Sequence, residues 1–217
     1  MMKLYSYFRS SASYRVRIAL NLKGLPYTVV PVHLLKDGGE QLTPAYRQLS
    51  PDALVPALRL EEQAATLTQS LAIIEYLEEV HPDLALLPKD ALDRAWLRSL
   101  ALSIACDIHP LNNLRVLRYL VNEMKLSETD KDRWYKHWVE QGLASLEKIL
   151  ASDSRVSRYC FGDKPGYVDC FLVPQVANAQ RMQCDLSGMP TINRINAACL
   201  ELETFAAASP ARQPDAE

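Results

Sequence analysis

The chain contains no run of apolar residues long enough to cross a membrane, and its amino terminus lacks the apolar core of a signal peptide. Its net charge of −2 provides no electrostatic reason to expect a nucleic-acid partner. The five cysteines are odd in number and include no Cys-x-x-Cys pair, which argues against a disulfide framework and a zinc site and indicates reduced thiols. We therefore expect a cytoplasmic protein that binds no metal, no membrane and no nucleic acid.

Length and composition restrict the class of protein only loosely. The 217 residues suffice for one large domain or two small ones with a substantial core. An apolar content of 48% and a charged content of 23% are ordinary for a globular chain. The indications of function must therefore come from local patterns.

The first 81 residues have the pattern of a mixed α/β domain. Strands are expected at Lys3–Tyr7, Tyr27–Val32, Ala57–Leu60 and Ala65–Thr68. Helical spacing covers residues 11–23 and Leu71–Val80. Gly24 is placed to end the first helix and Ser70 to cap the second.

The remainder of the chain is expected to be helical. Residues 82–89 contain two prolines and no clear period, which predicts a linker. From residue 90 to 217 helical periodicity dominates, and we expect the last residues, Ser209–Glu217, to lack regular structure. Asp169 is spaced to reach back to the Gly166 N–H group as half of a capping box.

A group of serines stands where the first strand gives way to the first helix, at Ser10, Ser11 and Ser13. A helix N-terminus carries unpaired N–H groups and roughly half a positive charge, so it stabilises an anion such as a thiolate. Arg9 and Arg15 add positive charge nearby. Plain N-capping by one of the serines explains the same spacing, so the pattern alone leaves both interpretations open.

Residues 10–20 resemble the serine-rich signature of the zeta-class glutathione transferases, whose best-known members are maleylacetoacetate isomerases. The family pattern is Ser-Ser-Cys-Ser-aromatic-Arg-Val-Arg-Ile-Ala-Leu, and this chain departs from it at Ala12. Because no thiol stands at position 12, a reaction in which that cysteine attacks the substrate is excluded. Further agreement occurs at Val55-Pro56, Gln69-Ser70 and residues 108–114, 172–179 and 212–215.

The resemblance implies a fold that combines an α/β and an all-α part. A thioredoxin-like glutathione-binding domain is expected at residues 1–81, a linker at 82–89 and an all-helical substrate-binding domain at 90–217. Glutathione is the implied cofactor, a small dicarboxylate the substrate and a homodimer the assembly. The implied activity is glutathione-dependent isomerisation of maleylacetoacetate to fumarylacetoacetate in tyrosine and phenylalanine catabolism, with glutathione transferase activity as a side reaction.

Two alternatives stay open. Residues 106–110, Cys-Asp-Ile-His-Pro, resemble bacterial maleylpyruvate isomerases of gentisate degradation as much as they resemble the maleylacetoacetate enzymes. The other alternative is an interaction module with the glutathione-transferase fold and no catalysis. Retention of Ser10, Ser11, Val55, Gln69 and Ser70 argues against such a module, because it would have no need to keep every glutathione contact.

The resemblance also implies roles for individual residues. Ser10 is the first candidate and Ser11 the second to donate a hydrogen bond to the glutathione thiolate, with Arg15 as a third member of the catalytic group. A cis Val55-Pro56 bond would expose backbone to the cysteinyl part of glutathione. The Gln69-Ser70 pair would hold the γ-glutamyl carboxylate. The full set expected to contact glutathione is Ser10, Ser11, Ala12, Ser13, Tyr14, Arg15, Gln41, Val55, Gln69, Ser70, His109, Asn113, Leu114 and Arg115.

The substrate carboxylates are expected to bind arginine, because its planar guanidinium pairs with a carboxylate through two parallel hydrogen bonds. The expected residues are Arg9, Arg115 and Arg181, with Arg15 as a further candidate.

Overall fold

The computed structural model describes all 217 residues, and they form two compact units. The amino-terminal unit contains Met1–Leu86 together with Leu200–Glu217, and the helical unit contains Leu87–Cys199. The sequence placed residues 200–217 in the helical domain, so their location differs from the expected boundary.

A four-stranded sheet forms the centre of the amino-terminal unit. Its strands are β1 (Met2–Ser6), β2 (Tyr27–Pro31), β3 (Ala57–Leu60) and β4 (Ala65–Thr68). They lie in the order β2-β1-β3-β4, with β1 parallel to β2 and the other pairs antiparallel. All four strands occur where the alternating pattern predicted them, to within a residue or so at each end.

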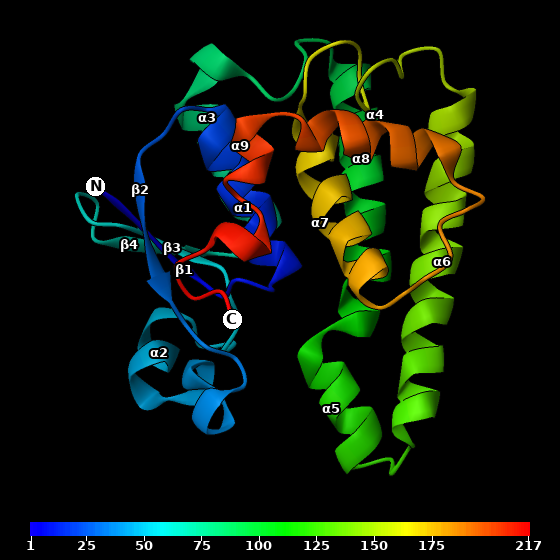
Figure 1. Cartoon of the computed structure of the whole chain (residues 1–217). Coiled ribbons are helices and arrows are strands. Elements are labelled where there is room, and N and C mark those ends of the chain that lie inside the picture. Colours follow the sequence, from blue (N-terminus) through cyan, green and yellow to red (C-terminus); the bar gives the residue numbers. More distant parts are fainter. The chain divides into compact units, whose positions relative to one another are not determined.

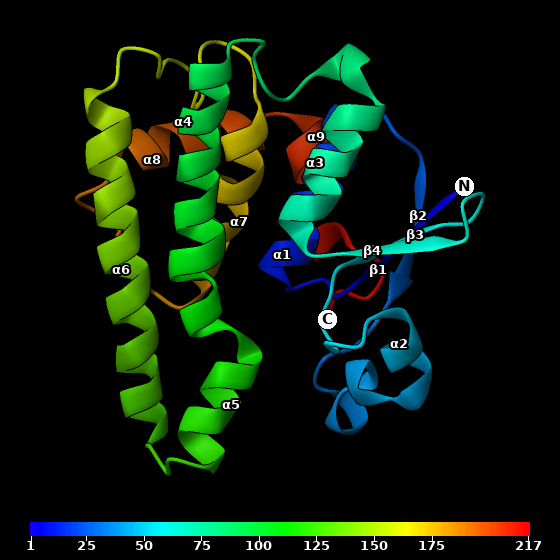
Figure 2. The ribbon, with the colours of Figure 1, turned by 180° about the vertical axis from the view of Figure 1, so that it is seen from behind.

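Four helices pack around this sheet, namely α1 (Ser11–Leu22), α2 (Pro44–Leu49), α3 (Ser70–Val80) and α9 (Glu203–Ala206). Figures 1 and 2 show α1, α3 and α9 on one side of the sheet and α2 on the other. Gly24 follows the end of α1 with φ of +61°, a conformation that glycine adopts without strain. The short helix α2 has no counterpart in the sequence prediction.

Hydrogen bonds from α1 explain why the end of the chain belongs to this unit. The Tyr14 hydroxyl donates to the Phe205 carbonyl at 3.3 Å, and Arg17 Nε donates to the Ala208 carbonyl at 2.8 Å. Residues Pro210–Arg212 form a 3₁₀ turn. The expectation that Ser209–Glu217 lacks regular structure was therefore wrong for these three residues, because the segment is anchored to α1.

A buried ion pair holds the start of the expected linker to the same unit. Lys23 Nζ lies 2.7 Å from Glu78 Oε2, and both side chains are almost fully buried. Lys23 also donates to the carbonyls of His81 and Leu84, while Glu78 accepts from the Leu86 N–H group. These contacts satisfy both charges. They also fasten residues 81–86 to the C-terminal ends of α1 and α3, so this part of the expected linker packs against the amino-terminal unit.

The helical unit consists of α4 (Ala91–Leu102), α5 (Leu114–Asn122), α6 (Glu128–Ser152), α7 (Tyr167–Arg181) and α8 (Pro190–Leu200). Its strand-like pairing is limited to an isolated bridge between Val156 and Gly162, which agrees with the expected all-helical domain. The Asp169 carboxylate accepts from the Gly166 N–H group at 2.8 Å, as the capping-box spacing predicted. None of the helices in the structure combines the length and the apolar character needed to span a membrane.

Helix α4 continues into a π-helical turn, η4 (Ser103–Ile108), which widens the helix before the chain changes direction. Ile108 is buried against α6 at Gly142. A Cβ atom at Gly142 would lie 2.4 Å from Ile108 Cγ1 and 2.5 Å from Cδ1. Because Gly142 has no side chain, α6 leaves room for Ile108 of the π-helical turn.

Gly142→Ala is expected to lower the free energy of unfolding by about 1–2 kcal/mol, because overpacking outweighs the better helix propensity of alanine. Denaturant titration measures the change. In an Ile108→Ala background the colliding atoms are absent, so the same Gly142→Ala substitution should be neutral or stabilising. Equal costs in the two backgrounds would contradict the contact.

Candidate functional site

The first candidate element is the turn from β1 into α1. Ser10 is the N-cap of α1, and its Oγ accepts a hydrogen bond from the Ser13 N–H group at 3.2 Å. A hydroxyl has one donor and two acceptor positions, so this cap leaves the Ser10 O–H able to donate to an anion. The two interpretations of the serines, N-capping and anion binding, are therefore compatible.

Accessibility distinguishes the members of the serine group. Ser11, Ala12 and Ser13 are buried, whereas Ser10 is only partly buried. Arg9 is exposed, with its guanidinium carbon 4.8 Å from the centre of the Phe8 ring. Tyr14 is buried and bonded to Phe205, as described above. Ser10 is thus the hydroxyl of this group that is most open to a ligand.

Arg15 connects this helix to the beginning of α3. Its side chain is 1% exposed, and Nη1 donates to Ser70 Oγ at 3.3 Å. The prediction that Ser70 caps α3 was wrong, because Gln69 holds the cap position and makes no side-chain capping bond. The guanidinium of Arg15, the further candidate for a substrate carboxylate, lies inside the unit.

Gln69 has an unusual backbone conformation, with φ of +67° and ψ of 113°. A residue other than glycine adopts such a positive φ only when its surroundings impose it, and such residues are frequent at binding sites. The N-terminal N–H groups of α3 follow directly. With Ser70 and Arg15 they make a second positively polarised helix end beside that of α1.

The segment before β3 presents backbone rather than side-chain groups. The Val55-Pro56 bond is cis, as the resemblance implied. The Leu54 carbonyl accepts from the Tyr46 hydroxyl at 2.7 Å and from Ser50 Oγ at 3.1 Å. None of the backbone hydrogen bonds outside the regular elements involves Val55, so its N–H and C=O groups have no backbone partner there.

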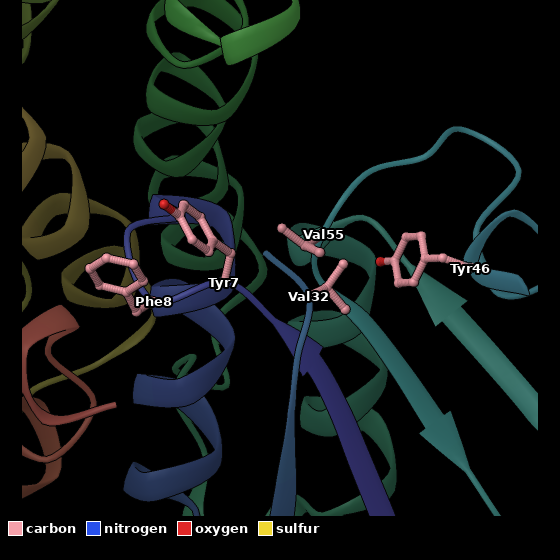
Figure 3. Close-up of a cluster of buried hydrophobic side chains, with 5 residues drawn as sticks. All are labelled: Tyr7, Phe8, Val32, Tyr46 and Val55. Atoms are coloured by element: carbon pink, nitrogen blue, oxygen red, sulfur yellow. The ribbon is translucent and has the colours of Figure 1, made fainter. Parts of the chain in front are cut away.

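Apolar packing holds the turn after β1 and the cis-proline segment before β3 in place. Tyr7, Phe8, Val32, Tyr46 and Val55 form a buried cluster that links the end of β1, the end of β2, α2 and the cis-proline segment (Figure 3). Burial raises the pKa of Tyr46, so this phenol stays protonated and able to donate. The cluster supports the backbone on both sides of the candidate site.

Gln41 lies in a short 3₁₀ turn, Glu40–Leu42, and is buried. Its Nε2 donates to the Leu34 carbonyl at 3.4 Å, while its Oε1 is buried without a hydrogen-bond partner. Gly39 has φ of +121°, and a Cβ there would lie 2.6 Å from the Gln41 amide. The glycine therefore makes room for Gln41, and the unpartnered oxygen marks it as a residue that could accept from a ligand.

In the helical unit, the residues predicted to contact glutathione come directly after the π-helical turn. His109 and Pro110–Asn112 form a 3₁₀ turn, and Asn113 caps α5 by accepting from the Arg115 N–H group at 3.1 Å. Arg115 is exposed at the start of α5. Trp134 on α6 donates to the Leu111 carbonyl at 2.9 Å, which fastens the turn to α6.

Asn112 is a candidate that the sequence analysis did not name. Both its Oδ1 and its Nδ2 are buried and lack a hydrogen-bond partner in the chain. Buried amide groups without partners are rare in folded proteins, because each forfeits its bonds to water. The family match at residues 108–114 was the available signal, since that segment includes Asn112.

Arg181 ends α7 and is exposed. It interacts with the Tyr135 hydroxyl on α6; burial raises the pKa of Tyr135 to about 12, and Arg181 opposes this rise. Tyr135 therefore stays neutral at physiological pH. The structure thus places Arg181 at one end of the helical unit, beside a phenol donor.

The amino-terminal unit thus has Ser10 at the start of α1, Gln69 and Ser70 at the start of α3, a bond from Arg15 to Ser70, and the cis peptide bond after Val55. Two helix ends carrying hydroxyls can bind anions, and the open backbone can pair with an extended peptide. These features suit a small ligand that carries negative groups and a short stretch of peptide backbone.

Comparison with known proteins agrees with this chemistry. The family described as Glutathione S-transferase, N-terminal domain, matches residues 9–80. The chain is 49% identical over 214 residues to a maleylpyruvate isomerase of a Ralstonia species, covering 99% of each protein. It is 48% identical to the maleylacetoacetate isomerase of Pseudomonas aeruginosa, covering 99% of this chain and 98% of that protein.

Solved structures extend the similarity to the whole fold. A holo structure of a maleylpyruvate isomerase, described as a bacterial zeta-class glutathione S-transferase, has a TM-score of 0.94 at 48% identity, covering 99% of this chain and 100% of the other. A maleylacetoacetate isomerase of Anaeromyxobacter dehalogenans with bound dicarboxyethyl glutathione and citrate has a TM-score of 0.87 at 41% identity, covering 100% of this chain and 98% of the other.

The fold and the site therefore define a glutathione transferase. Within this class, the curated relatives from Ralstonia and Pseudomonas, which match along nearly the whole length, are named as isomerases. The chain belongs to the zeta-class family of maleylacetoacetate and maleylpyruvate isomerases.

Proposed function

We propose that this protein is a glutathione-dependent cis–trans isomerase that converts maleylacetoacetate to fumarylacetoacetate in tyrosine and phenylalanine catabolism. The observation that carries the proposal is the pairing of two hydroxyl-bearing helix N-termini, those of α1 and α3, through the bond from Arg15 to Ser70. A site of this kind binds two negative groups at a fixed separation, and glutathione has a thiolate and a γ-glutamyl carboxylate.

The residues present fit glutathione. Gln41 offers a buried oxygen without a partner, and Val55 offers backbone groups beside the cis-proline. Ser70 and the first N–H groups of α3 would hold the γ-glutamyl carboxylate. Ser10 would donate its hydroxyl to the sulfur, and the α1 N-terminus would keep that sulfur ionised by favouring negative charge.

Bound glutathione supplies a thiolate that adds reversibly to the maleyl double bond, so that the bond rotates as a single bond before the thiolate leaves. The protein's own task is to keep the nucleophile charged and to hold the acidic substrate. Ser10 is neither a strong acid nor a strong base, so it acts by hydrogen bonding rather than by proton transfer. Ala12 provides no competing thiol.

The substrate carboxylates require paired positive charge, since an unpaired carboxylate is costly in a site that excludes water. We assign this role to Arg9, Arg115 and Arg181, all three of which are exposed. His109, Asn113 and Leu114 precede or adjoin Arg115 and are proposed as further glutathione contacts. Arg15 is assigned to positioning Ser70, because it is buried.

Maleylpyruvate is the second candidate substrate. The chain is 49% identical to a maleylpyruvate isomerase and 48% identical to a maleylacetoacetate isomerase, so overall similarity does not separate them. Both substrates carry the maleyl group on which the chemistry occurs. Their other ends differ, so the choice depends on residues that meet that end.

A paired assay tests the function. With glutathione present, the purified protein should isomerise maleylacetoacetate with a higher kcat/KM than maleylpyruvate. Ser10→Ala should lower kcat about 10–100-fold. This is less than the loss of a donor at an oxyanion site costs, because sulfur is a softer hydrogen-bond acceptor than oxygen. The same substitution removes the α1 N-cap, which should lower the free energy of unfolding by only about 1 kcal/mol. Ser10→Thr retains the hydroxyl and should keep most of the activity. If the wild-type protein turns over neither substrate, the proposed function is wrong.

Arg181→Ala should raise the KM for the diacid substrate roughly tenfold, because a charge-assisted hydrogen bond contributes about 1.5–3 kcal/mol. Its glutathione affinity should stay close to that of the wild type. Arg133→Ala is the matched control, since Arg133 is an exposed α6 arginine paired with Asp130. An unchanged KM in Arg181→Ala would remove this residue from substrate binding.

A cytoplasmic homodimer is the proposed assembly, on the basis of the family and of the general frequency of symmetric dimers. Sedimentation equilibrium should give about twice the chain mass of 24.4 kDa. A single species of 24.4 kDa at micromolar concentration would count against it.

A further inference from the structure

The carboxy-terminal segment, residues 203–217, lies beside the turn that carries Ser10, although some 200 residues separate them in the chain. Its contacts with α1 include the bonds from Tyr14 and Arg17 described above and one from Asn21 Nδ2 to the Thr204 carbonyl at 2.9 Å. Figures 1 and 2 show the end of the chain next to the end of β1. Residues 212–215 of this segment agree with the family pattern, although none of them belongs to the proposed glutathione site.

Both polar groups of the Phe8 backbone are bonded by distant side chains. The Phe8 N–H group donates to Asp215 Oδ2 at 2.9 Å, and the Phe8 carbonyl accepts from Arg17 Nη2 at 3.1 Å. The turn is closed by a bond from the Ser10 N–H group to the Tyr7 carbonyl at 3.0 Å. Because Ser10 is two residues from Phe8, these bonds determine where the Ser10 hydroxyl lies.

The backbone on both sides of Asp215 is fastened through Gln213, whereas the second carboxylate oxygen, Oδ1, is buried without a hydrogen-bond partner. Gln213 Nε2 donates to the carbonyls of Ala207 and Ser209 at 2.9 and 3.0 Å, and the Ala216 N–H group donates to the Gln213 carbonyl at 3.1 Å. Arg17 is fully buried, and the Asp215 carboxylate lies near enough to favour its charged form. The hydrogen bonds of Gln213 thus fasten the backbone around Asp215, and the Phe8 N–H group is the partner of its Oδ2.

We propose that Asp215 is a positioning residue for the thiolate site and acts through the Phe8 backbone on Ser10. The inference rests on the proposed role of Ser10 in the isomerase. A hydroxyl stabilises an anion only when it is held close to the productive geometry. Residues that support such a group commonly change activity about 10- to 100-fold, and we expect an effect of about tenfold for Asp215.

Charge and hydrogen bonding at Asp215 have opposite effects on a nearby thiolate. The negative charge of Asp215 disfavours a second anion, so removing the charge alone lowers the pKa of a bound thiol. Loss of the hydrogen bond to Phe8 releases the turn, weakens the Ser10 contact and raises that pKa. Asp215→Asn removes the charge and keeps an acceptor oxygen, whereas Asp215→Ala removes both.

The experiment measures the pKa of the glutathione thiol in the binary complex, from the ultraviolet absorbance of the thiolate, for the wild type and three variants. The thiolate fraction at neutral pH should be about tenfold lower in Asp215→Ala than in Asp215→Asn. Asp215→Asn should match or exceed the wild type. Arg212→Ala is the matched control, because it breaks a surface pair with Glu203 in the same segment without touching the turn.

Equal thiol pKa values in Asp215→Ala and Asp215→Asn would overturn the proposal, as would an equal change in Arg212→Ala. Should Asp215→Ala fail to fold, Asp215→Glu keeps the charge and displaces the oxygen by one methylene. It should show a raised thiol pKa, and a wild-type value would contradict the proposal. These readouts need glutathione alone, so they remain measurable if the protein isomerises neither maleyl substrate.

Discussion

A guanidinium group without water around it must direct its N–H groups at protein oxygens, and the position of Arg17 makes this the central constraint of the amino-terminal unit. Arg17 is fully buried, and its donors reach Ser6 Oγ, the Phe8 carbonyl and the Ala208 carbonyl. Burial lowers its pKa to about 10, which still leaves it protonated at neutral pH. One side chain thereby joins the last residue of β1, the turn before α1 and the end of the chain.

The same helix organises the site. Within one turn of Arg17, Arg15 connects α1 to Ser70 at the start of α3. The two arginines thus have separate tasks, although the sequence shows them only as alternate basic residues beside a serine group. Arg17 holds the turn that precedes Ser10, and Arg15 brings the second helix end to the first. An anion site made of two helix termini depends on such cross-links, because neither terminus determines the position of the other.

The helical unit shows a comparable dependence between distant residues. The π-helical turn that ends at Ile108 is accommodated by the bare backbone of Gly142, and Trp134 holds the following turn through the Leu111 carbonyl. This places His109, Asn112 and Asn113 in an irregular segment between two helices, in which Asn113 caps α5 and the Asn112 side-chain amide keeps no partner in the chain.

The sequence by itself determined the four strands, α1, α3, the Gly24 helix end, the Asp169 cap and the family, because periodicity, turn residues and short motifs are local properties. It could not show that Ser70 accepts from Arg15 instead of capping α3, that Arg15 is buried, or that residues 200–217 pack on the amino-terminal unit. Nor could it show that Asp215 holds the Phe8 backbone. Only the tertiary structure decided these points, because each depends on hydrogen bonds and burial between residues far apart in the chain, which leave no periodic signal near either partner.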